Sequence, residues 1–142
     1  MRHREFRSRA RALAFLAAWA AGCQRPAEEA EGGAKPLSRT EFTERIENFF
    51  EYDPLRAGRP SQFRIHLTEL SEGSPVAGAD VSLRLLSESV AVVESEARAG
   101  KVAGIYLAEV TPSSPGSFDV EFRVRTSSLD ETMRLSGFSV EP

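Results

Sequence analysis

The side chains able to do chemistry are few in this sequence of 142 residues. It holds one cysteine, Cys23, and two histidines, His3 and His66. Metal sites and acid–base catalysis usually draw on several His or Cys residues. The sequence shows no nucleophile in the context of a base and no phosphate-binding loop. It therefore predicts a protein that is not an enzyme and needs no cofactor.

His66 and Met133 are the candidate metal ligands, and both are weak. His66 could pair with a carboxylate such as Glu69 or Glu51, but one imidazole with oxygen ligands makes a poor site. Met133 is the only methionine after the initiator, and a Cu(I) site normally needs several sulfur ligands. We expect a surface histidine and a core-filling methionine. A periplasmic metal-binding accessory protein remains an alternative.

A group of carboxylates near residue 45 admits two interpretations. With spacings of three and four residues, these side chains would line one face of a short helix at 40–48. A strand through 42–52 is the other possibility. In either case a solvated face is expected more than a cation site. The group comprises Glu41, Glu44, Glu47 and Glu51.

The N-terminus has the features of an export signal. Residues 1–11 are basic, and residues 12–22 form an apolar run that is too short to span a bilayer about 30 Å thick. This length fits a secretory signal. The residues before Cys23 are small and resemble a bacterial lipobox, although Ala20 stands where the motif usually has a branched apolar residue. The resemblance implies cleavage before Cys23 and lipidation of its thiol.

We therefore expect 1–22 to be a lipoprotein-type signal peptide and the mature chain to be lipid-anchored in the bacterial envelope, on the periplasmic side. Stable anchoring requires two or more acyl chains, which a lipoprotein carries. Gln24 in place of Asp indicates the outer membrane over the inner one, by resemblance to lipoprotein sorting in enteric bacteria. Plain secretion is the alternative.

Charge and composition divide the remainder of the chain. The leader carries five arginines and one glutamate while the whole chain has a formal charge of −3, so the mature part is acidic. This argues against nucleic acid as a partner. Residues 23–39 are rich in Glu, Ala, Gly and Pro, which predicts a disordered linker. Residues 40–142 remain for one domain.

The domain shows the alternation of half-buried strands. Apolar and polar side chains alternate in 63–68, 80–85 and 118–125, with Gly- or Pro-containing turns between the runs. Gly137 indicates a bulge in a later strand. The sequence predicts an all-β fold, an immunoglobulin-like antiparallel β-sandwich of about seven strands. The weaker strand candidates are 42–52, 89–94, 102–111 and 132–140.

Residues 40–70, TEFTERIENFFEYDPLRAGRPSQFRIHLTEL, resemble the N-terminal region of periplasmic adaptor subunits of RND-type heavy-metal efflux pumps, the membrane fusion proteins. The runs at 75–85 and 104–124 are similar to the same domain. The resemblance implies an immunoglobulin-like accessory domain, freestanding or truncated, that associates with efflux components. Matching positions include Thr43, Glu44, Phe50, Glu51, Pro54, Leu55, Gly58, Phe63, His66, Leu67, Thr68 and Leu70.

The densest aromatic group of the chain lies at 49–55. If Phe49, Phe50 and Tyr52 are exposed, they would form a partner-binding patch, and the alternative is that they pack at the edge of the core. The functional hypothesis is a lipid-anchored, non-catalytic envelope interaction module associated with an RND efflux adaptor system. A generic secreted immunoglobulin-like domain is a further alternative.

Overall fold

The computed structural model describes residues 34–142, so the expected signal peptide, Cys23 and most of the expected linker lie outside the described residues. Between residues 34 and 142 every regular element is a strand, and no helix there is long and apolar enough to cross a membrane. The strands are β1 (Leu37–Phe42), β2 (Ile46–Tyr52), β3 (Ser61–Glu69), β4 (Ser74–Pro75), β5 (Asp80–Ser87), β6 (Val90–Ala99), β7 (Ile105–Val110), β8 (Gly116–Arg125) and β9 (Asp130–Val140).

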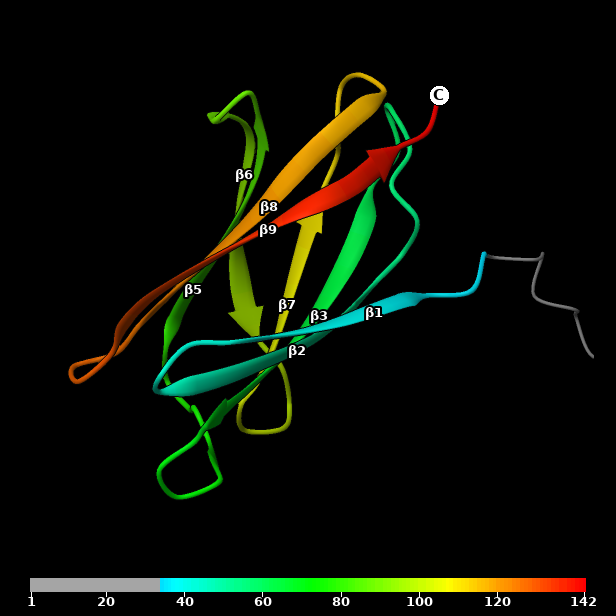
Figure 1. The fold of residues 1–142 in the computed structure, drawn as a ribbon. Helices are drawn as coiled ribbons and strands as arrows, with labels where there is room; N and C mark the ends of the chain where they lie inside the picture. The colour runs from blue at the N-terminus through cyan, green and yellow to red at the C-terminus, as the bar shows by residue number, and fades with distance from the viewer. Residues whose placement is uncertain (1–33) are drawn as a thin grey trace, which may run out of the picture. The chain divides into compact units, whose positions relative to one another are not determined.

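The strands form an antiparallel sandwich that is nearly a barrel (Figure 1). One layer holds β1, β2, β3 and β7 in that order, and the other holds β5, β8 and β9. Strand β6 belongs to both layers because it pairs with β5 and, at its C-terminal end, with β7. The prediction of an all-β antiparallel sandwich is therefore confirmed.

Seven of the nine strands coincide with the predicted runs, and β1 and β4 are additional. Strand β1 begins at Leu37, three residues inside the segment expected to be linker, so the predicted boundary at 39 is too late. The helix considered for 40–48 is wrong, since this stretch is the end of β1, a turn and the start of β2. The turn is closed by Thr43, whose backbone N–H donates to the Ile46 carbonyl at 2.9 Å.

The core fills the space between the two layers. Alternate residues of each long strand point inward, as the period-two pattern requires, and Phe50, Phe63 and Phe122 have no exposed area. The ring centroids of Phe50 and Phe122 lie 4.7 Å apart, so the two layers meet through aromatic contacts. Met133 is 3% exposed in the same core, which agrees with the expected core-filling role.

Two local features shape the sheets. Gly137 has φ +83° beside a register shift in the β8–β9 ladder, which confirms the predicted bulge. Gly104 has φ +78°, and a Cβ there would lie 2.9 Å from the Leu67 carbonyl oxygen. Because the Leu67 N–H donates to the Gly104 carbonyl at 2.8 Å, this close approach connects β3 to the start of β7.

Side chains close the ends and the open side of the sandwich. The Tyr106 hydroxyl donates to the Val76 carbonyl at 2.8 Å and accepts from the Ala79 N–H at 3.0 Å, which holds the β4–β5 loop against β7. Between β1 and β9 the Arg39 guanidinium donates to the Ser136 carbonyl at 2.8 Å. Arg39 also lies over the Phe138 ring, 4.7 Å from its centroid.

Candidate functional site

The outward side of β2, β3 and β7 mixes apolar side chains with charged ones. The register places Phe49 opposite His66, and His66 opposite Ile105, in one row across the three strands. All three residues are only half-buried. We call this surface the Phe49 face. It comprises Glu47, Phe49, Glu51, Arg64, His66, Ile105 and Leu107.

His66 lies at the centre of the Phe49 face. Its Nε2 atom has no hydrogen-bond partner and almost no solvent contact, although one third of the side chain is exposed. The nearest carboxylate oxygen, Oε2 of Glu51, lies 3.9 Å from Nε2, which is too far for a hydrogen bond. The Phe49 ring packs edge-on against the imidazole at 5.3 Å between centroids. A polar atom buried without a partner is costly, but because Nε2 has almost no solvent contact, a bound group could reach it only after the neighbouring side chains move.

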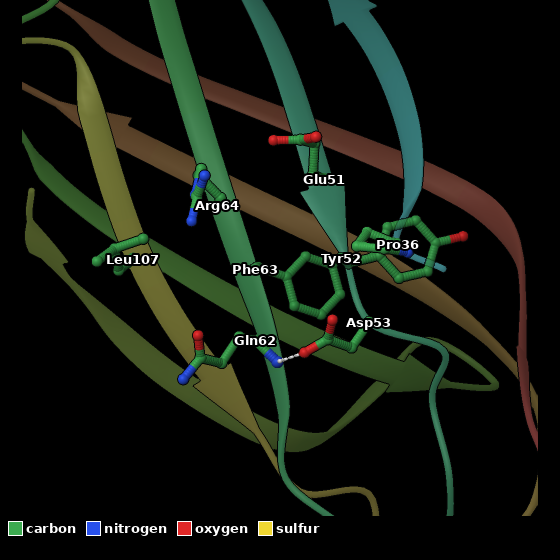
Figure 2. A pocket seen from close by; sticks show the side chains of 8 residues that line it. All are labelled: Pro36, Glu51, Tyr52, Asp53, Gln62, Phe63, Arg64 and Leu107. Carbon is green, nitrogen blue, oxygen red and sulfur yellow. Dashed lines mark hydrogen bonds between the residues drawn. The ribbon is translucent and has the colours of Figure 1, made fainter. Parts of the chain in front are cut away.

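A shallow pocket of about 130 Å³ adjoins the Phe49 face (Figure 2). Leu107 forms its apolar side, and Glu51 and Arg64 bring opposite charges to its rim. At the far end the Gln62 N–H donates to an Asp53 carboxylate oxygen at 3.4 Å. Sites for drug-sized ligands are usually several times larger. The pocket is therefore suited to receiving one side chain of a partner.

The three residues of the predicted aromatic patch do not share a face, and only Phe49 points outward. Phe50 is fully buried and Tyr52 is 8% exposed, because both point inward on β2. Burial raises the pKa of the Tyr52 phenol above its usual value, and the charge of Arg39 partly opposes that effect. Phe49 points outward and belongs to the Phe49 face. Phe50 is thus a core residue that a partner cannot reach, whereas Tyr52 is largely buried but still lines the shallow pocket.

The structure separates the two candidate metal ligands. His66 is on the outward face of β3, and Met133 is inside the sandwich on β9. Residues 34–142 contain no group of three or more His, Cys, Asp or Glu side chains arranged to hold a metal ion. Of the two carboxylates proposed beside His66, Glu51 is the near one, whereas a Glu69 oxygen accepts from the Ser71 hydroxyl at 3.2 Å.

The four glutamates expected to share a face do not gather. Glu41 lies on β1 opposite Asn48, and Glu44 is in the β1–β2 turn. Glu47 and Glu51 alone share the outward side of β2. The strand conformation therefore disperses a group that helical spacing would have aligned.

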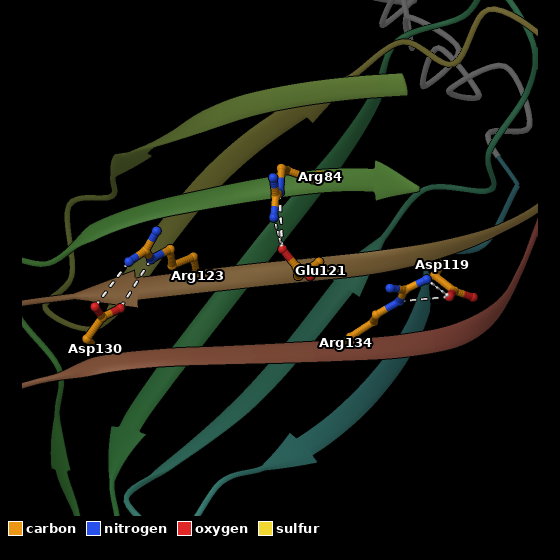
Figure 3. Close-up of polar contacts among 6 residues, drawn as sticks. All are labelled: Arg84, Asp119, Glu121, Arg123, Asp130 and Arg134. Atoms are coloured by element: carbon orange, nitrogen blue, oxygen red, sulfur yellow. Dashed lines mark hydrogen bonds and ion pairs between the residues drawn. The ribbon is translucent and has the colours of Figure 1, made fainter. Parts of the chain in front are cut away.

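The outward side of β5, β8 and β9 has the opposite character (Figure 3). The register aligns charges of alternating sign in one row across β6, β5, β8 and β9. We call it the charged row. It consists of Glu94, Arg84, Glu121 and Arg134.

Three arginines on this second face are paired with carboxylates, whereas Glu94 forms no ion pair among the described residues. Arg84 forms a close ion pair with Glu121, whose side chain is only 14% exposed. Arg134 binds Asp119 at 2.8 Å, and that bond holds the pKa of the Asp119 carboxyl below its usual value. Arg123 binds Asp130 at 3.1 Å and likewise holds the pKa of the Asp130 carboxyl below its usual value. Paired charges leave a partner little to gain.

The sequence reasoning missed Asn48 and Ile105. Asn48 points into the core from β2 with no exposed area, and neither atom of its amide group has a hydrogen-bond partner. Its strand neighbour Phe49 points outward, so the regularly alternating β2 places a polar residue inside and an apolar residue outside at these two positions. The sequence did contain a signal for this arrangement: the order Ile-Glu-Asn-Phe-Phe at 46–50 breaks the strict alternation of apolar and polar residues.

Comparisons with known proteins bear on the fold. No protein-family model and no curated protein matches the chain. A crystal structure of a DUF4426 family protein from Pseudomonas aeruginosa PAO1 is similar, with a TM-score of 0.52 and 15% identity over 74% of this chain and 95% of that one. The ZirS C-terminal domain gives a TM-score of 0.42 and 12% identity, over 96% of this chain and 86% of that one. At such low identity the first likeness shows the fold alone.

Proposed function

We propose that the chain is a non-catalytic interaction module of the bacterial envelope, lipid-anchored through Cys23 and associated with an RND efflux adaptor system. The observation that carries the interaction role is the Phe49 face. It places an aromatic ring and two aliphatic side chains, each only half-buried, around His66 on an outward surface. Surfaces of this kind, with polar groups at the rim, are typical of protein contacts.

The efflux association rests on the sequence resemblance in 40–70. Several matching positions, such as Phe50 and Phe63, point into the core and would suit any sandwich. Glu51 and His66 also match, and both lie on the Phe49 face. Packing alone does not explain these two outward residues, so they support a shared binding role.

Photo-crosslinking in the native bacterium tests this role. A benzoylphenylalanine at position 49 of the full-length chain should crosslink to an efflux pump component. The matched control replaces Thr132, an exposed position on the outward side of β9 next to the charged row, and should give no such product. No adduct from position 49, or the same adducts from both positions, would contradict the proposed face.

The anchor has its own test. The intact mass of the protein extracted from native membranes should equal that of the chain beginning at Cys23 with added acyl chains. Cys23→Ala should abolish the added mass and release the protein from the membrane. A mass corresponding to cleavage elsewhere would leave a secreted domain without a lipid anchor.

A further inference from the structure

Strand β6 parts from β7 over most of its length. Only Arg98 and Ala99 of β6 pair with β7, opposite Leu107 and Tyr106. From Val90 to Ala97 the strand pairs with β5 alone, and Figure 1 shows β6 and β7 diverging. Among the described residues, the other edge of this stretch has no backbone partner, and an unpaired edge is a template for another strand.

The charge pattern explains where the pairing stops. If the β6–β7 register continued, Ala97 would oppose Ala108 and Glu96 would oppose Glu109. Carboxylates directly opposite each other destabilise a ladder. Both glutamates are exposed, and Glu94 lies two residues further along the same side of β6. The open edge is therefore flanked by negative charge on both strands.

The opening also leaves the core partly uncovered. Val93 and Ala97 point inward and contact the core, yet both are only partly buried. Inward residues of the neighbouring strands, such as Leu83 on β5, have no exposed area. Val90 and Val92 are 65% and 47% exposed on the same strand. An added strand would cover apolar surface here, which favours its binding.

Backbone donors are available along this edge. The Gly100 N–H donates across to the Ile105 carbonyl at 2.7 Å. In an antiparallel ladder alternate residues direct their N–H groups to the same side. The N–H groups of Glu96 and Glu94 are therefore directed to the open edge.

We propose that β6 is a strand-addition site, at which an extended, cationic segment of a partner protein pairs with residues 90–97. Lysine or arginine at every second position of that segment lies beside Glu94 and Glu96. Small apolar side chains at the intervening positions cover Val93 and Ala97. Main-chain hydrogen bonds supply affinity and alternate side chains supply specificity, as in other strand-addition complexes. The site is on a different strand from the Phe49 face and does not depend on it.

The test uses a short capped peptide that alternates lysine with valine or threonine, added to the full-length chain in detergent solution. Amide hydrogen exchange at Glu94 and Glu96 should slow by about tenfold or more at saturation. A peptide of the same sequence, N-methylated at alternate residues, keeps its charge but loses one hydrogen-bonding edge. It should bind at least about tenfold more weakly.

Two variants separate the site from general charge attraction. Glu94→Lys combined with Glu96→Lys should weaken binding of the parent peptide by about tenfold or more. Glu72→Lys, in the exposed β3–β4 loop, should leave it unchanged. Equal binding of the methylated peptide, or unchanged exchange at Glu94 and Glu96, would overturn the proposal. Protection that rises with protein concentration without peptide would identify a second copy as the occupant and would also overturn it.

Discussion

The two outward faces of this sandwich differ in whether their polar groups have partners within the fold. The charged row matches each arginine with a carboxylate, so its polar groups are satisfied within the fold. The Phe49 face leaves an aromatic ring half-exposed and an imidazole nitrogen without a partner. Both faces obey the same strand alternation. The two faces therefore differ in pairing: the arginines of the charged row have carboxylate partners, whereas Nε2 of His66 has none.

Truncating the Phe49 face should produce the largest effect. Phe49→Ala together with Ile105→Ala should weaken partner binding by about 30-fold, because aromatic anchors in an interface centre contribute about 2 kcal/mol or more. Binding to the crosslinked partner can be measured by titration. Thr132→Ala on the other outward face should leave affinity unchanged, and equal losses from both changes would abolish the distinction between the faces.

Asn48, on the inward side of β2, allows the cost of an unpaired polar group in this strand to be measured. Its amide is buried without a partner, and such a group costs about 1–3 kcal/mol. Asn48→Leu keeps the branching of the side chain and is somewhat larger; it should raise the free energy of unfolding by about 1–2 kcal/mol, because removal of the unpaired amide outweighs the tighter packing. Urea denaturation measures this change. A loss of stability would mean that the amide is satisfied by water in solution.

Two glutamates at comparable places on the two faces allow a matched test. Glu121→Ala should lower the free energy of unfolding by about 1 kcal/mol, because it leaves the partly buried ion pair with Arg84 broken. Glu51→Ala should cost less than about 0.5 kcal/mol, since its oxygen is 3.9 Å from His66 and makes no hydrogen bond to it. If Glu51 proves the more important, the two faces are not distinguished by pairing.

The smallest effect concerns acid stability. Arg134 and Arg123 lower the pKa values of Asp119 and Asp130 in the folded state. The stability that this contributes is present above the unfolded pKa of about 4 and is lost as pH falls through the lower folded values. Unfolding followed from pH 7 to pH 2 should show this loss. Arg134→Ala should reduce it, and an unchanged acid profile would contradict the assignment.

Much of the fold could be predicted from the sequence because strict alternation is a local signal. The runs at 63–68, 80–85 and 118–125 coincide with parts of β3, β5 and β8. Prediction failed where the signal depends on distant pairing. Strand β1 looks like linker because it is polar and exposed, and it is held by its ladder with β2 and by Arg39 bound to β9.

The site was only partly predictable for a related reason. His66 was placed correctly on the outward side of β3, since it alternates with Ile65 and Leu67 in an unambiguous run. On β2 no such run exists, and Phe50 and Tyr52 were grouped with Phe49 by proximity in the sequence. Adjacent residues of a strand point to opposite faces. The three residues therefore could not share one face, and Phe49 lies apart from Phe50 and Tyr52.

The sequence by itself determined that this chain has an all-β sandwich domain and that the part of the chain after the basic N-terminal segment is acidic. These conclusions depend on composition and short-range periodicity. Only the tertiary structure decided which face is paired and which is not, and where β6 leaves β7. Those properties arise from the register between separate strands, such as Phe49 beside His66, and from the end of the β6–β7 ladder before Glu96 could oppose Glu109. No local pattern encodes that register.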